Sequence, residues 1–402
     1  MESSSESNGN STYNQIPKTI EPMPTIIRLI RTWKLPVAMI IGVLLYYLFD
    51  VIMPERETRD AFYYVISHII QPALIFAMLL LSFLKVEPRN LKPHRWHGVL
   101  LLTQGALFVL FSLLALQSEH LSEFLSCLLP GIGLTQSSLK LLCEGVMLCF
   151  ICPTATASAV IVQKLGGSLS GDVTYIVLCN LMVSLLAPGF LTLVEPHAGL
   201  DFLTEFFMIM GKVFPLLLCP LFVALIIRHY TPTLKSWLLA IPDLAFYMWL
   251  VALALAITVT VRTIVESHTP LGILFSLALV SAVCCVAQFR LGRKIGRRWP
   301  QPRTVLHSSS SPSDNLASPS SPLRSVSTSP LSSTSTHIAD IYERSAVTAG
   351  QAFGQKNTVF IIWMGLVFLN PVTSVVGGFY SLWHNIINSR QLYQREKILS
   401  EK

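Results

Sequence analysis

Ten stretches of about 20 mostly apolar residues follow one another along the chain, and each is long enough to cross the hydrocarbon of a bilayer as a helix. Only 13% of the 402 residues are charged and 52% are hydrophobic, which leaves too few charges to cover soluble domains. The chain is therefore predicted to be an all-α polytopic membrane protein with ten transmembrane helices. The stretches are 36–54, 61–84, 96–117, 137–164, 171–194, 203–228, 239–264, 270–289, 344–368 and 371–389.

The balance of residues excludes several classes of protein. A mean hydropathy of +0.58 argues against a soluble enzyme, a disordered protein and a nucleic-acid binder, although the pI is about 9.0. The eight cysteines lie almost entirely in apolar runs, where cysteine acts as a small hydrophobic residue. Even the pair Cys149 and Cys152, spaced as CxxC, is predicted to pack rather than to bind metal or exchange electrons.

Basic residues are distributed unequally between the two sides of the predicted spans. With ten spans and the N-terminus inside, 23 of the 29 Lys and Arg residues fall on the cytoplasmic side and four on the other. This asymmetry predicts cytoplasmic termini in an inner or plasma membrane. The tails are 1–35 and 390–402, and 291–343 is predicted to be a disordered cytoplasmic loop, because 308–336 contain 14 Ser.

Two of the spans are interrupted. The fourth contains Pro153 followed by small polar residues, and the ninth contains Gly350 and Gly354 among Gln, Lys and Asn. Because the breaks occupy the fourth position of the first five spans and of the last five, they predict two inverted five-helix repeats, 36–195 and 202–290 with 344–389. Broken helices at matched places are typical of secondary transporters. A simple proline kink is the alternative for the fourth span.

The two breaks supply the predicted substrate site. Exposed backbone at membrane depth is tolerated only when it is buried in protein or lines a watered cavity. The breaks are therefore predicted to cross near the midplane and to line a cavity there. The residues assigned to it are Pro153, Thr154, Thr156, Ser158, Gly354, Gln355, Asn357 and Thr358.

Charged residues within or beside the spans are few, and each is costly in hydrocarbon. Glu144 and Lys356 are the deepest, and Lys356 occupies the ninth-span break itself. Asp172, Lys212 and Asp243 lie near span ends and can instead reach the interface. Glu144, Asp172 and Lys356 are the candidates for ion binding or coupling.

At these motifs the chain resembles the bile acid:sodium symporter superfamily. The matching segments are CPTATASAVIVQKLGG at 152–167, LLAP at 185–188 and GQAFGQKN at 350–357. The resemblance covers about residues 25–395 apart from the Ser-rich loop. It implies a panel domain and a core domain, with the broken fourth and ninth helices crossing at the substrate site.

The resemblance also implies two sodium ions beside the crossing, but the ligand set is incomplete. Ser158 matches a serine ligand and Gln104 a glutamine ligand. Ala159, Asp172 and Ile176, however, stand where the family has asparagine, serine and threonine. The acid that bridges both ions aligns with Ala352, and the following Gln aligns with Lys356. Because an ammonium is incompatible with a sodium site, two-sodium coupling is not expected here, and a proton is the alternative coupling ion.

The predicted function is secondary active transport of an organic anion, such as a bile-acid-like carboxylate or a steroid sulfate, by alternating access. A non-transporting receptor or scaffold of transporter descent is the alternative. An enzyme is not predicted, because HExxH, GxSxG and paired intramembrane aspartates are missing. The predicted partners are the small anion and the lipid bilayer, with no nucleic acid and no cofactor, and the oligomeric state stays open.

Overall fold

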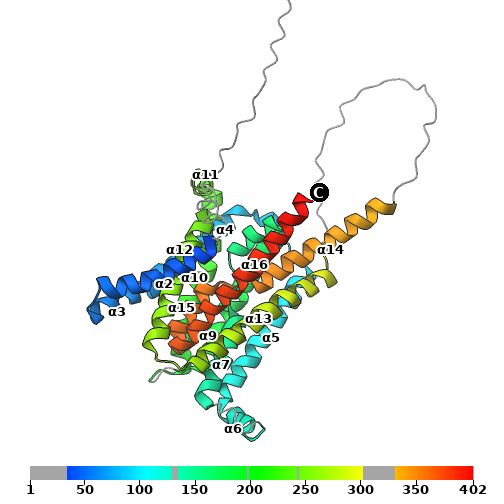
Figure 1. Ribbon diagram of the computed structural model, residues 1–402. Helices are drawn as coiled ribbons and strands as arrows, with labels where there is room; N and C mark the ends of the chain where they lie inside the picture. The colour runs from blue at the N-terminus through cyan, green and yellow to red at the C-terminus, as the bar shows by residue number, and fades with distance from the viewer. Residues whose placement is uncertain (1–33, 129–134, 197–198, 242–243, 302–330, 402) are drawn as a thin grey trace, which may run out of the picture.

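The computed structural model describes residues 34–128, 135–196, 199–241, 244–301 and 331–401 (Figure 1). Within these ranges the secondary structure is helical, apart from one isolated bridge between Thr154 and Lys356. The helices are α2 (Lys34–Ile52), α3 (Arg56–Val65), η1 (Ile66–Ile70), α4 (Gln71–Lys85), η2 (Pro88–Asn90), α5 (Arg95–Leu116), α6 (Ser118–Leu128), α7 (Gln136–Ile151), α8 (Ala157–Lys164), α9 (Leu169–Val194), α10 (Phe202–Tyr230), α11 (Pro232–Ala240), α12 (Leu244–Glu266), α13 (Leu271–Arg298), α14 (Leu331–Gly354), α15 (Thr358–Phe368), η3 (Pro371–Ser374) and α16 (Val375–Ser400).

Among the described residues, six helices are long and apolar enough to cross a membrane. They are Arg56–Lys85, which joins α3, η1 and α4, together with α5, α9, α10, α12 and α13. The other four predicted stretches are also helical. Pro36–Ile52 and α15 are shorter apolar helices, α7 and α8 form an interrupted pair, and α16 follows η3. The prediction of an all-α membrane protein is confirmed at this level.

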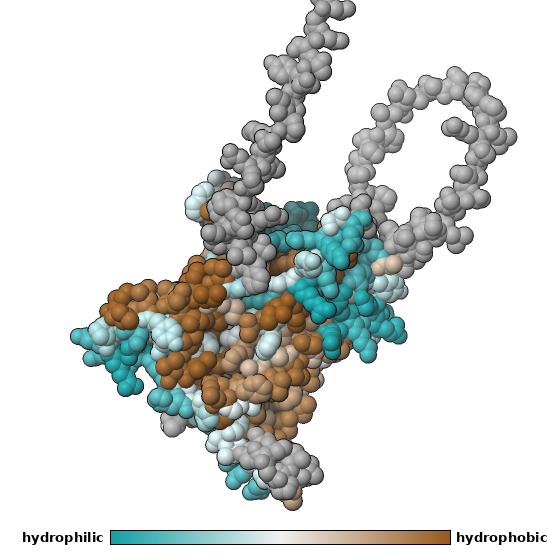
Figure 2. Space-filling view, viewed as in Figure 1, coloured by the Kyte–Doolittle hydropathy of each residue, from teal (hydrophilic) through white to brown (hydrophobic). Residues whose placement is uncertain are grey.

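The outside of the bundle is apolar over its middle. Side chains such as Val51, Leu102 and Phe275 are 78, 76 and 71% exposed. Figure 2 shows this hydrophobic surface as a broad brown region between teal ends. A patch of this extent would be unfavourable in water, so it indicates contact with lipid.

Glycines allow the helices to approach closely. A Cβ built at Gly292 or Gly296 of α13 would strike the backbone of α14, at Ala349 O and Ser345 O. At Gly42 of α2 it would lie 2.5 Å from Ala254 O of α12. Small residues at contacts between membrane helices permit this packing, which in lipid replaces the hydrophobic effect as the source of association.

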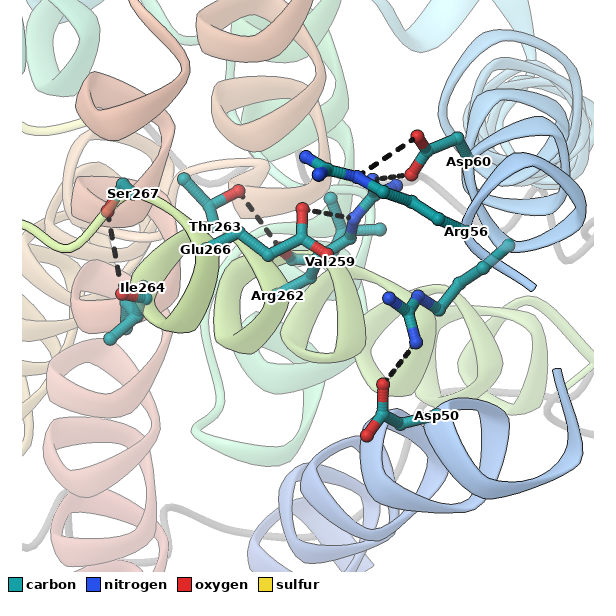
Figure 3. A network of polar contacts seen from close by, with 10 residues as sticks. Asp50, Arg56, Asp60, Val259, Arg262, Thr263, Ile264, Glu266 and Ser267 are labelled. Atoms are coloured by element: carbon teal, nitrogen blue, oxygen red, sulfur yellow. Dashed lines mark hydrogen bonds and ion pairs between the residues drawn. The ribbon is translucent and has the colours of Figure 1, made fainter. Parts of the chain in front are cut away.

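Ion pairs hold α2, α3 and α12 together (Figure 3). Arg262 of α12 pairs with Asp60 of α3 and, at 2.9 Å, with Glu266 one turn further along α12. Its guanidinium also lies 4.3 Å from the centroid of the Tyr63 ring. A second pair joins Arg59 of α3 to Asp50 of α2. This network is called the α3–α12 clamp below.

Helices extend into the segments that were predicted to be loop and tail. The predicted loop 291–343 is wrong at both ends, because α13 continues to Arg298 and α14 begins at Leu331; 302–330 lie outside the described residues, as do 1–33 of the N-terminal tail. The predicted C-terminal tail is helical to Ser400. Charge ends a membrane span but does not end a helix, and α13 keeps packing on α14 through Gly296.

Candidate functional site

The two interrupted helices cross and complete each other's hydrogen bonds. The gap between α7 and α8 spans Cys152 to Thr156, and the gap between α14 and α15 spans Gln355 to Asn357. The Ala155 amide donates to Gln355 O at 2.9 Å, and the Asn357 amide donates to Pro153 O at 2.9 Å. Backbone groups left free by each break are thus satisfied by the other break.

Side chains fix this crossing from several directions. The Thr154 hydroxyl donates to Ala352 O at the end of α14. Asn357 caps α15 by accepting from the Phe360 amide at 3.3 Å. The Tyr380 hydroxyl of α16 donates to Gly354 O at 2.7 Å. The crossing is therefore a packed element rather than a flexible loop.

The Lys356 ammonium lies at the crossing and is fully buried. Its Nζ donates to Gln104 Oε1 of α5 at 2.9 Å, and the Tyr175 hydroxyl of α9 donates to the same oxygen at 2.9 Å. Nζ also lies 5.0 Å from the centroid of the Phe353 ring. Within the described residues no carboxylate lies within ion-pair distance of this cation.

Asp172 pairs with a hydroxyl instead of Lys356. Its Oδ2 accepts from Ser158 Oγ of α8 at 2.6 Å, which joins the start of α9 to the start of α8. Its Oδ1 has no hydrogen-bond partner in the described part of the chain. The side chain is fully buried, so this carboxyl belongs to the interior of the protein and does not reach the interface.

Glu144 is also buried away from Lys356. Its Oε2 accepts from Thr373 Oγ1 of η3 at 2.8 Å. Lys140 lies 3.9 Å from Glu144 but 3.0 Å from Glu195, at the end of α9. Glu144 therefore ties α7 to η3, and in this conformation neither predicted acid provides the counter-charge of Lys356.

The remaining predicted site residues are buried at or next to the crossing. Both amide atoms of Gln355 and the Thr358 hydroxyl have no hydrogen-bond partner among the residues described. Thr156 precedes α8 and its side chain does not cap the helix, and Gly354 packs directly against the Phe289 ring. Unpaired buried polar groups are uncommon in folded proteins, so these side chains are candidates for contact with a polar ligand.

Three polar residues of α16 were missed by the sequence analysis. Ser381, His384 and Asn385 are buried, and their side chains contain nitrogen or oxygen atoms without described hydrogen-bond partners. The His384 ring centroid lies 6.4 Å from that of Trp249 on α12 and 5.9 Å from that of Tyr380. The available sequence signal was the presence of three polar residues within five positions of the otherwise apolar tenth stretch.

An open, mostly apolar pocket of about 500 Å³ lies beside the α3–α12 clamp. Its walls come from α3, η1, α12, the end of α15 and η3, and they include Tyr63, His68, Arg262 and Asn370. None of the eight predicted substrate residues lines it. The pocket therefore opens between α12 and the α15–η3 turn, away from the crossing itself.

The oxygen atoms available at the crossing do not form a binding site for a sodium ion. Gln104 Oε1, one of the oxygens that the resemblance assigns to sodium, accepts from the Lys356 ammonium. A hard cation needs about five or six oxygen ligands, whereas Ala159, Ile176 and Ala352 offer no side-chain oxygen at the aligned positions.

No protein-family model and no curated protein matches the chain. The kind of ligand that the crossing could bind is therefore inferred from its residues. It holds one buried ammonium, the amino ends of α8 and α15 with their partial positive charge, and unpaired amide and hydroxyl groups. Such a set favours an anion with additional polar groups.

Proposed function

We propose that this protein is a secondary active transporter that moves an organic anion across the membrane by alternating access. The observation that carries the proposal is the mutual crossing of two broken helices around buried Lys356. In many secondary transporters the substrate binds near the middle of the membrane, at a site formed by interrupted helices. The proposal agrees with the resemblance to the bile acid:sodium symporter superfamily.

Helix contacts support a ten-helix fold of two inverted repeats. If α2, α4, α5, α7 and α9 correspond to α10, α12, α13, α14 and α16, three of the main helix contacts have an equivalent contact, although that between α9 and α10 has no equivalent among them. α2 packs on α12 as α10 packs on α4, and α5 packs on α7 as α13 packs on α14. Likewise α5 packs on α9 as α13 packs on α16. Pairing of this type is expected from two halves of equivalent structure.

The anionic group of the substrate is proposed to bind between the amino ends of α8 and α15, within reach of Lys356. Gln355 and Thr358 provide hydrogen bonds that the resting protein leaves unmade. His384 and Asn385 of α16 extend this polar surface toward α12. The rest of the substrate contacts apolar walls, as is usual for ligand sites.

Transport is proposed to be independent of sodium, because Gln104 Oε1 already accepts a hydrogen bond from the Lys356 ammonium. A proton is the proposed alternative. Both termini are proposed to lie in the cytoplasm of an inner or plasma membrane, because the basic residues gather on that side.

The proposal is tested by uptake into proteoliposomes. Radiolabelled carboxylates and steroid sulfates that raise the melting temperature of the purified protein are offered as substrates. Asn357→Leu removes the cap of α15 and Ser158→Leu removes the partner of Asp172, so each is expected to abolish uptake.

The matched control is Asn370→Leu, which removes a similar cap from η3 away from the crossing. It should leave more than half of the uptake. Normal uptake by both Asn357→Leu and Ser158→Leu would contradict the proposed site. Anion binding without uptake by the native protein would favour a receptor instead.

A further inference from the structure

One face of α13 changes from apolar to basic along its length. Leu279 and Val283 are 54 and 61% exposed, and Arg290 and Lys294 further along the helix are exposed as well. At about 100° per residue these four side chains fall within about 60° of arc. Arg298 follows Lys294 by four residues on the adjoining surface. Arg290, Lys294 and Arg298 are called the basic stripe.

The basic stripe lies away from the helix contacts of α13, and its one described contact is that of the Arg298 guanidinium, 5.8 Å from the centroid of the Trp299 ring. The opposite face of α13 contains Gly292 and Gly296, which contact α14. Neighbouring Arg293 and Arg297 pair with Glu343 of α14. In contrast, no carboxylate of the described residues pairs with the three stripe residues.

The depth of the stripe follows from helix geometry. At 1.5 Å per residue, Arg290 lies about 29 Å along the axis from Leu271, which is close to the thickness of the hydrocarbon core. Lys294 lies about 6 Å further, at the level of the lipid headgroups. Figure 2 shows hydrophilic surface at the end of the molecule where α13 and α16 finish, next to the apolar region.

We propose that the basic stripe binds the phosphate groups of anionic phospholipids in the leaflet next to this end of α13. Two observations favour a lipid over a soluble anion. The three cations have no acidic partner among the described residues, and the apolar side chains directly below them are placed to contact acyl chains. Basic residues beside a span attract anionic lipid in this way.

Native mass spectrometry of the full-length protein in detergent tests the proposal, with added phosphatidylglycerol or phosphatidylcholine at equal concentration. The native protein is expected to retain at least tenfold more phosphatidylglycerol. Arg290→Gln, Lys294→Gln and Arg298→Gln together should remove this preference. Lys294→Gln alone should weaken phosphatidylglycerol binding about fivefold, which is the effect expected of one basic residue at the surface.

The matched control removes three exposed basic residues at a different part of the molecule, Lys85, Arg89 and Lys92. Changing these to Gln lowers the net charge equally and should leave phosphatidylglycerol binding within twofold of the native value. Melting temperatures in detergent alone verify that each variant is folded. Equal retention of both lipids by the native protein, or equal loss in both triple variants, would overturn the proposal.

Discussion

The buried Lys356 ammonium contacts an amide oxygen, whereas a buried cation is normally paired with a carboxylate. Its partner is Gln104 Oε1 at 2.9 Å, and burial of an ammonium without a counter-charge is unfavourable by several kcal/mol. An anionic substrate can supply the missing charge. We therefore expect Lys356→Gln to lower uptake at least tenfold, since a hydrogen bond to a charged group is worth about 1.5–3 kcal/mol. The same change should leave the melting temperature equal or higher.

The control for Lys356→Gln is the same substitution at Lys212 of α10, an exposed lysine, which should leave uptake unchanged.

The sodium dependence of uptake is a separate test of the role of Lys356. Uptake by the native protein should be equal in choline and sodium buffers. Lys356→Gln combined with Ala352→Glu restores the pattern of the resembling family and should create sodium dependence. A native protein that needs millimolar sodium would contradict this explanation of Lys356.

Between elements, the α3–α12 clamp depends on one guanidinium. Arg262 is 19% exposed at its side chain, contacts Asp60 and Glu266, and lies over the Tyr63 ring. Arg262→Gln removes the cation shared by Asp60 and Glu266 and its contact with the Tyr63 ring, so we expect the free energy of unfolding to fall by about 1–2 kcal/mol. The midpoint of thermal unfolding in detergent measures the effect.

Arg56 provides the matched control within the same network. It also contacts Asp60, at 4.0 Å, but its side chain is 86% exposed. Pairs of this kind contribute about 0–1 kcal/mol, so Arg56→Gln should change the midpoint little. If the two variants were equally unstable, total charge rather than the clamp would hold α3 to α12.

Across the whole molecule, the sequence predicted the helices and the two breaks because both depend on local chemistry. Apolar length determines a membrane helix. The breaks follow Pro153 and Gly354, where small and polar residues replace the apolar run, whereas Pro188, Pro215 and Pro220 lie inside continuous helices. The partners of Lys356, Asp172 and Glu144 could not be predicted in this way. They depend on which side chains of α5, α8 and η3 lie next to these three residues, and that follows from how the helices pack together.

The orientation of the whole chain can be tested with its own cysteines. Cys127 is exposed on α6, at the end of the bundle opposite to the C-terminus, whereas six others are buried and Cys219 is half-buried (Figure 1). If both termini are cytoplasmic, a membrane-impermeant maleimide added to intact cells should label Cys127, and Cys127→Ser should remove the label. In that background, Ser400→Cys near the end of α16 should react only after the cells are permeabilised. Labelling of Ser400→Cys in intact cells would reverse the proposed topology, and with it the leaflet assigned to the cytoplasm.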